Sequence, residues 1–331
     1  MDRLHYPKVL VLFFIFMSHT SYSKNNPVVN ILTWWDYLNV GDIKKTIEND
    51  CKCTISYDEY YSTNDFLKRY ANQAAQYDIL IFSDSIYQVM KDNLPKIKVD
   101  VKDILKKYHP SVRKHYNDQQ YTDNMMIFDM ATSGFLYNKK NTQIEGSDKI
   151  DDLFNKSKDK VVSIGDDYAE VYTLFGKIPS PLDFKRYKSH VKDLIITNKL
   201  DRIPYDKDFS FSYSWSGETL VYLVNQDNSD LDLFVHQDLS HISKDIVVMI
   251  LDSPEKRCVY KRLVSEDIVK KVTESELYFS PFGPQDRKNS VFKKVEADFF
   301  SKIEKLKWLN INEGKLPHYI DRQWENTRGA I

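Results

Sequence analysis

The feature that most constrains the fold is an alternation of short apolar runs with helical segments near the start of the chain. Apolar, partly β-branched runs at 28–32, 54–57 and 77–82 predict strands. Segments 40–48 and 64–74 lie between them and carry apolar residues at helical spacing. Strands that alternate with helices in this way predict βαβ units and a largely parallel sheet. The chain is therefore expected to be an α/β protein.

The rest of the chain continues this alternation, and 331 residues are enough for two domains. Further strands are expected at 161–164 and 245–251, and helices at 151–158, 187–197, 254–263 and 265–273. Residues 125–138 are expected to form two extended pieces joined near 131–134, where the chain could cross between domains. Residues 278–284 contain proline and glycine and predict an irregular connection.

The first residues predict an export signal. Arg3 and Lys8 accompany a continuous apolar run at 9–17, which is too short to span a bilayer. Ser21 and Ser23 have the spacing that signal peptidase requires, so cleavage is expected after Ser23. The alternative is an uncleaved anchor. No cysteine follows the apolar run, so a lipid anchor is not expected.

Composition and cysteine usage exclude several classes of protein. A net charge of −1 gives no electrostatic basis for binding nucleic acid, and neither a P-loop nor a Gly-x-Gly-x-x-Gly motif is present. Export permits disulfides, so Cys51 or Cys53 could pair with Cys258 and leave one thiol over. The cysteines lack matching histidine spacing, so neither a metal nor a cofactor is expected. His236 and His241 are expected in loops or on the surface.

Aromatic and acidic side chains recur where the predicted strands end. In open α/β sheets, ligands bind beyond the carboxyl ends of the strands. Aromatic faces attract cations and carboxylates pair with them, so these groups together predict one cleft for an organic cation. The groups are Trp34, Asp36 and Tyr37; Ser83, Asp84 and Ser85; Asp167 and Glu170; and Trp215 and Asp245.

Each of these groups also has a structural alternative. Trp34 and Trp35 could belong to the core while Asp36 caps the next helix. Asp167 and Glu170 stand three residues apart and could form an ordinary capping box. The sequence at this point leaves both interpretations open.

The same elements, in this order, resemble the periplasmic spermidine/putrescine-binding proteins of polyamine ABC importers. The likeness extends over nearly all of the mature chain. The family's Asn-Trp-x-Glu-Tyr turn is similar to residues 33–37, its Tyr-Asp-Leu-Val-Val-Pro-Ser element to 77–83, and its Asp-Asp-x-x-Glu-Val-Phe element to 166–172. Its Trp-x-Gly turn is similar to residues 215–217, and its Gly-Tyr-Pro-Thr-Pro hinge to 277–281. Its later strand that begins with Asp is similar to the strand that begins at 245.

The resemblance implies a two-lobed type II periplasmic binding protein with crossing strands as a hinge. Its lobes would comprise 24–131 plus 244–284, and 132–243 plus 285–331, after a signal peptide at 1–23. Such a protein is a periplasmic monomer that captures a putrescine- or spermidine-like cation and delivers it to an inner-membrane ABC permease, with no catalysis.

The resemblance also implies roles for individual residues. Trp34, Tyr37 and Trp215 would flank the ligand, while the carboxylates that pair its amines would be Asp36, Asp167, Glu170 and Asp245. Ser83, Asp84, Ser85 and Tyr278 complete the predicted ligand-binding set.

The chain departs from the family pattern at several positions in and near the predicted site. The family usually has aromatic residues where this chain has Ser85 and Ser243, and no carboxylate where it has Asp84. The ligand could therefore be a different small amine or an amino-acid-like solute. An enzyme on the same fold, or a sensor that contacts a membrane receptor, would also be compatible with this sequence.

Overall fold

A computed structural model describes residues 26–329, except 198, 206–207, 227–228 and 311–316. The predicted signal peptide and its cleavage site lie outside these residues. Within the described ranges, no helix has the length and apolar character needed to cross a membrane.

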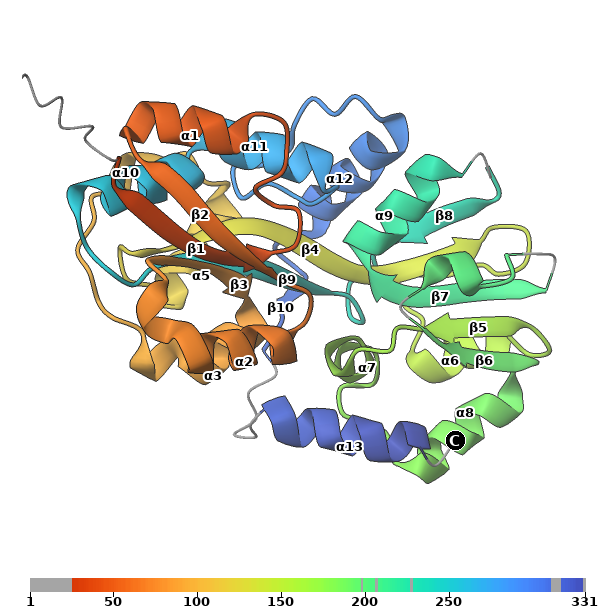
Figure 1. The fold of residues 1–331 in the computed structure, drawn as a ribbon. Helices are drawn as coiled ribbons and strands as arrows, with labels where there is room; N and C mark the ends of the chain where they lie inside the picture. Colours follow the sequence, from red (N-terminus) through yellow and green to blue (C-terminus); the bar gives the residue numbers. More distant parts are fainter. Residues whose placement is uncertain (1–25, 198, 206–207, 227–228, 311–316, 330–331) are drawn as a thin grey trace, which may run out of the picture.

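The described strands form one 10-stranded sheet with the order β2-β1-β3-β9-β4-β7-β5-β6, while β10 pairs with β9 and β8 with β4 (Figure 1). The strands are β1 (Val28–Trp34), β2 (Thr54–Tyr60), β3 (Ile79–Ser83), β4 (Met125–Asn138), β5 (Val161–Ile164), β6 (Asp193–Ile196), β7 (Phe209–Trp215), β8 (Leu231–Phe234), β9 (His241–Met249) and β10 (Lys307–Trp308). The helices are α1 (Ile43–Cys51), α2 (Thr63–Gln73), α3 (Asp84–Met90), α4 (Lys102–Leu105), α5 (Pro110–Asp118), α6 (Ile150–Lys156), α7 (Tyr168–Phe175), α8 (Pro181–His190), α9 (Ser216–Asn225), α10 (Pro254–Leu263), α11 (Glu266–Ser275), α12 (Ser290–Lys302) and α13 (Pro317–Gly329).

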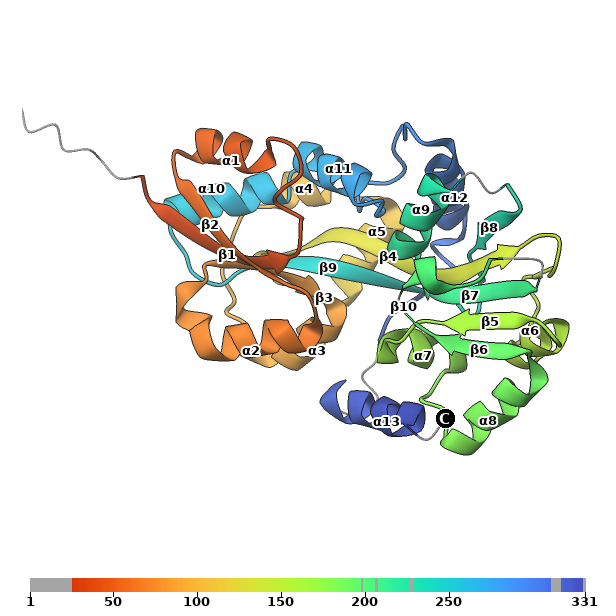
Figure 2. The same ribbon diagram turned by 45° about the vertical axis from the view of Figure 1, so that its right-hand side comes forward.

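The first lobe is built on the predicted parallel strands. β1 pairs in parallel with β2 on one side and β3 on the other. Figures 1 and 2 show α1, α10 and α11 on one side of these strands, and α2 and α3 on the other. Helix α1 buries Ile43 and Ile47, the apolar residues that predicted it. The βαβ expectation is confirmed here.

A disulfide ties two helices of this lobe together. Cys51, the last residue of α1, is bonded to Cys258 of α10. Of the two pairings that the sequence left open, the structure has Cys51 with Cys258, and Cys53 remains a buried free thiol. Cys51 and Cys53 do not share a strand, because Cys51 ends helix α1 and β2 begins only at Thr54.

The second lobe joins the first through β4 and β9. β4 pairs with β9 up to Thr132 and with β7 from Ser133 onward, so this strand passes from one lobe to the other. Residues 125–138 thus form one continuous strand rather than two extended pieces, but the change of partner strand between Thr132 and Ser133 falls within the expected joining region, 131–134. Gly134 lies inside this continuous strand. A Cβ at this position would lie only 2.9 Å from a methyl carbon of Leu233 on β8, so a larger residue would push the two strands apart. Its glycine permits a close approach of neighbouring strands.

Two further expectations in the second lobe were wrong. The helix predicted over 187–197 ends at His190, and Asp193–Ile196 forms β6, which pairs in parallel with β5. The β-branched Ile195 and Ile196 suit a strand despite their helical spacing. His241, expected in a loop or on the surface, is instead the first residue of β9 and is half-buried. His236 does lie in the loop between β8 and β9, but it is fully buried there, and its Nδ1 accepts backbone N–H bonds from Asp238 and Leu239.

Candidate functional site

A cavity of about 1020 Å³ lies between the two lobes. Ten of the eleven residues predicted from the sequence line this cavity: Trp34, Tyr37, Ser83, Asp84, Ser85, Asp167, Glu170, Trp215, Asp245 and Tyr278. They come from both lobes and from the crossing strand β9. The ends of β1, β3 and β7 all reach this one space, which explains why polar residues recur after them.

Asp36 is the predicted residue that does not line the cavity. Its backbone is left-handed, with φ of 72°, and its N–H donates to Glu59 Oε1 at 3.0 Å. It does not cap the next helix either, since α1 begins after Asp42. The neighbouring Trp35 is 55% exposed, so the core alternative for this residue was wrong. Trp34 is half-buried and its ring lies 4.4 Å from that of Tyr60.

Carboxylates dominate the charge of the cavity. Acidic lining residues outnumber basic ones among the described residues: Asp84, Asp129, Asp167, Glu170, Asp201, Glu218, Asp245 and Glu276 against Lys199 and Lys244. Such an excess of one sign in an enclosed space focuses a negative potential. The cavity is therefore suited to a cation.

The crossing strands hold a pair of buried acids at the cavity wall. The Tyr37 hydroxyl donates a 2.6 Å bond to Asp245 Oδ2. Burial raises the pKa of Asp245 to about 7. Asp129 was not predicted, although it is the one acid in the apolar run of β4, a signal that could have identified it. Burial, and then the neighbouring Asp245, raise the pKa of Asp129 well above its usual value.

The second lobe presents a further acidic group at the start of α7. Asp167 caps this helix, since its Oδ1 accepts the Ala169 N–H at 2.7 Å, and it also lines the cavity. Glu170 Oε1 accepts the Trp215 N–H at 3.0 Å, whereas its buried Oε2 has no hydrogen-bond partner in the part of the chain described. Burial, and then Glu218 and Asp167, raise the pKa of Glu170.

Gly165 makes room for this arrangement. A Cβ at Gly165 would lie 1.6 Å from Glu170 Oε2, so only glycine allows the carboxyl to occupy its position. Glu218, which the sequence did not single out, lines the same region from α9. It stands directly after the Trp-x-Gly turn that drew attention to Trp215.

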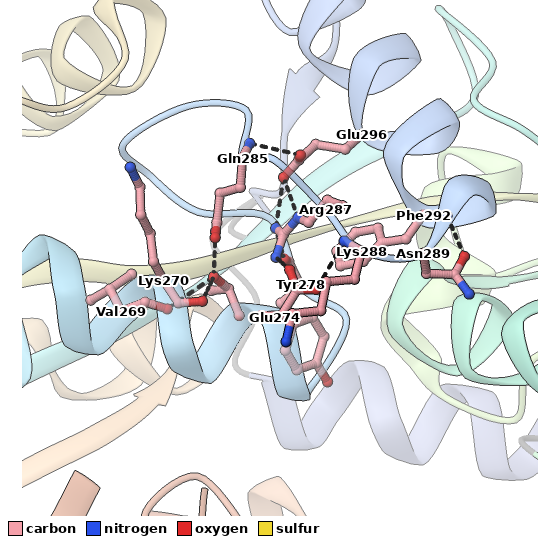
Figure 3. A network of polar contacts seen from close by, with 11 residues as sticks. Val269, Lys270, Glu274, Tyr278, Gln285, Arg287, Lys288, Asn289, Phe292 and Glu296 are labelled. Carbon is pink, nitrogen blue, oxygen red and sulfur yellow. Dashed lines mark hydrogen bonds and ion pairs between the residues drawn. The ribbon is translucent and has the colours of Figure 1, made fainter. Parts of the chain in front are cut away.

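Tyr278 reaches the cavity from a segment fixed by a buried ion-pair network. Figure 3 shows the Arg287 guanidinium between the Tyr278 carbonyl and Glu296 of α12, with Nη2 at 2.8 Å and 2.6 Å from the two acceptors. Arg287 also reaches Glu274 of α11 at 2.8 Å. A Cβ at Gly217 would lie 2.6 Å from the Tyr278 ring, so this ring packs directly on the start of α9. Tyr278 thus touches both lobes.

Asp84 is already paired with a lysine of the protein. Its Oδ2 lies 3.3 Å from Lys244 Nζ, and both side chains are buried. The charge of Asp84 is therefore balanced without any ligand. In the described residues, no group of three or more histidine, cysteine, aspartate or glutamate side chains has the geometry to hold a metal ion.

No family model and no curated protein matches this chain. Several solved structures do. The spermidine/putrescine ABC transporter substrate-binding protein PotD from Streptococcus pneumoniae is 15% identical over 92% of this chain and 99% of that one, with a TM-score of 0.67. The Tp0655 (TpPotD) lipoprotein of Treponema pallidum is 14% identical over 91% and 99%, with a TM-score of 0.68.

A third structure shows that the same fold accommodates other ligands. Iron-bound HitA from Pseudomonas aeruginosa is 10% identical over 92% of this chain and 99% of that one, with a TM-score of 0.62. At such identities the likeness establishes the fold alone: this chain has the two-lobed α/β fold of type II periplasmic binding proteins. The identity of the ligand therefore depends on the side chains that line the cavity.

Proposed function

We propose that the protein is an extracytoplasmic solute-binding protein that captures an elongated organic amine of the putrescine/spermidine class. One observation carries the proposal: Asp129 Oδ2 at the crossing strands and Glu170 Oε2 in the second lobe are buried, line the cavity and have no partner among the described residues. Buried carboxylates without a partner are costly, and a cation that bridges them removes the cost.

The aromatic residues of the cavity support the same ligand class. Trp34, Tyr37, Trp215 and Tyr278 line it together with the carboxylates. Their faces suit the methylene chain and ammonium groups of a polyamine. Micromolar affinity corresponds to about −8 kcal/mol, which two buried charge pairs with aromatic contact can supply.

Transport completes the proposal. The two lobes close on the ligand about the crossing strands. The first lobe comprises residues 24–131 plus 244–284, and the second comprises 132–243 plus 285–331. The mature chain is monomeric, is released to the periplasm by cleavage after Ser23, and delivers its ligand to an inner-membrane ABC permease. Sequencing the N-terminus of the exported protein tests the cleavage, and an intact Met1 contradicts it.

The ligand is tested by calorimetric titration of the mature chain with putrescine and spermidine. Asp167→Asn should weaken binding at least tenfold, because an ammonium loses a charged partner while the asparagine still caps α7. Asp166→Asn is the matched control: Asp166 is the adjacent residue but pairs with Arg328 and does not line the cavity, so affinity should not change. If neither polyamine binds the wild-type chain, the proposal fails.

A further inference from the structure

The cavity wall of the first lobe contains an ammonium group that belongs to the protein itself. Lys244 on β9 is only 3% exposed, and its Nζ lies 3.3 Å from Oδ2 of Asp84, which is 2% exposed. Ser243 Oγ donates to the other oxygen of Asp84 at 3.2 Å. Asp84, Ser243 and Lys244 all line the cavity, so this pair faces the ligand space.

An aromatic ring completes the surroundings of this ammonium. Lys244 Nζ lies 5.4 Å from the ring centroid of Trp308, within the range of a cation–π contact. The His115 ring stacks on Trp308 at 3.8 Å and holds it in place. A carboxylate and an aromatic face around one ammonium are the groups that recognise a primary amine.

We infer that Lys244 is a built-in amine. Its ammonium group fills the position beside Asp84 and Trp308 in the first lobe, where a cation of the ligand would otherwise bind. The ligand's ammonium groups are then confined to the crossing strands and the second lobe, where Asp129 and Glu170 each have one buried oxygen without a hydrogen-bond partner among the described residues. This consequence for the ligand rests on the proposed function, whereas the occupancy of the first-lobe position by Lys244 does not. Lys244 therefore sets the number of charges, and hence the length, of the amine that the cavity accepts.

Chemical rescue tests the occupancy without reference to the natural ligand. Lys244→Ala should lower the melting temperature, because Asp84 loses its partner. Adding n-propylammonium chloride, which matches the three carbons and the ammonium that the substitution removes, should restore most of the loss, while sodium chloride of equal ionic strength should not. Asp84→Asn/Lys244→Ala should show no amine-specific recovery, because the carboxylate is absent.

A matched ion pair away from the cavity provides the control. Lys256 pairs with Asp78 at 2.8 Å in the same lobe, and neither residue lines the cavity. Lys256→Ala should therefore show no recovery with n-propylammonium. If Lys244→Ala behaves like Lys256→Ala, the inference is overturned.

If Lys244→Ala does not fold unaided, it is refolded with and without the added amine. A chain that folds only when n-propylammonium is present supports the inference. A chain that folds under neither condition, while Asp84→Asn/Lys244→Met folds normally, overturns it, because the vacated position then accepts no amine.

Polyamine titration tests the consequence for the ligand. Lys244→Ala should gain at least fivefold in affinity for spermidine relative to putrescine, since the longer amine gains a position for its extra charge. An unchanged ratio would refute the role of Lys244 in selecting length. If the wild-type chain binds no polyamine, the proposed function fails, and the rescue experiment still decides whether Lys244 fills an amine position.

Discussion

Asp129 on β4 and Asp245 on β9 stand directly opposite each other across two antiparallel strands, and both side chains are buried. Like charges at such a position destabilise a sheet. The strands that carry them link the two lobes, so the cost falls on the part of the molecule about which the lobes would move. A cation between the lobes would offset it, which couples ligand binding to this pair.

The cost of this pair can be measured in the absence of ligand. Because burial raises the pKa of Asp129, folding takes up a proton, and stability falls as pH rises from about 4. Asp129→Asn removes this term and should raise the free energy of unfolding at pH 8 by at least about 1 kcal/mol, with little gain at pH 4. Urea unfolding at the two pH values measures the difference.

A surface aspartate serves as the control for this substitution. Asp193 is exposed on β6, so Asp193→Asn should leave stability unchanged at both pH values. If Asp129→Asn destabilises the protein equally at pH 4 and pH 8, the carboxyl makes a structural hydrogen bond and the repulsion between the two acids is not its main effect.

Ligand affinity should itself depend on pH. Burial raises the pKa of Asp245 to about 7 and also raises that of Glu170, so the empty cavity holds protons at neutral pH. A cationic ligand pairs with ionised carboxylates and must displace these protons, so affinity should rise with pH through this range. Putrescine should bind about tenfold more weakly at pH 6 than at pH 8.

Calorimetry in buffers of different ionisation enthalpy would count the protons released on binding. Asp245→Asn should reduce both the number of protons and the slope of affinity against pH. Affinity that is flat from pH 6 to pH 8, with no proton release, would mean that these acids are ionised before the ligand arrives.

The Arg287 network should dominate the stability of the segment that carries Tyr278. The Arg287 side chain is 0% exposed and its partner Glu296 is 1% exposed. Arg287→Met leaves Glu296 buried and unpaired, which should cost about 3–5 kcal/mol in the free energy of unfolding. Lys293→Met removes a nearby ion pair with Asp286 that lies on the surface, so it should leave stability unchanged. Equal effects in the two variants would contradict the role assigned to Arg287.

Much of the site followed from the sequence because it depends on one local pattern. A strand that ends in an aromatic residue, as at Trp34 and Trp215, or is followed directly by an acidic one, as at Asp84, can be recognised without knowing its neighbours. Since the sheet brings these ends to one cavity, a local pattern predicted a shared location. The α/β class followed from the same alternation.

The parts that could not be predicted depend on backbone conformation and on distant pairing. Asp36 stands in the expected motif but has a left-handed backbone, and no local pattern indicates that. No local pattern indicates that Asp84 pairs with Lys244, which is 160 residues away in sequence. Asp129 was missed for a different reason, since it is the one acid in the apolar run of β4 and this local signal was not used.

Gly165 offers the most direct test of Glu170. In Gly165→Ala the new Cβ would lie 1.6 Å from Glu170 Oε2, so the carboxyl must move out of its position. Polyamine affinity should therefore fall at least tenfold. Gly146→Ala is the matched control, since a Cβ at Gly146 would meet nothing within 4 Å. Calorimetry together with melting temperatures separates lost binding from lost folding. If Gly165→Ala folds and binds putrescine like the wild-type chain, Glu170 does not contact the ligand, and the second lobe's contribution must come from Asp167 and Glu218.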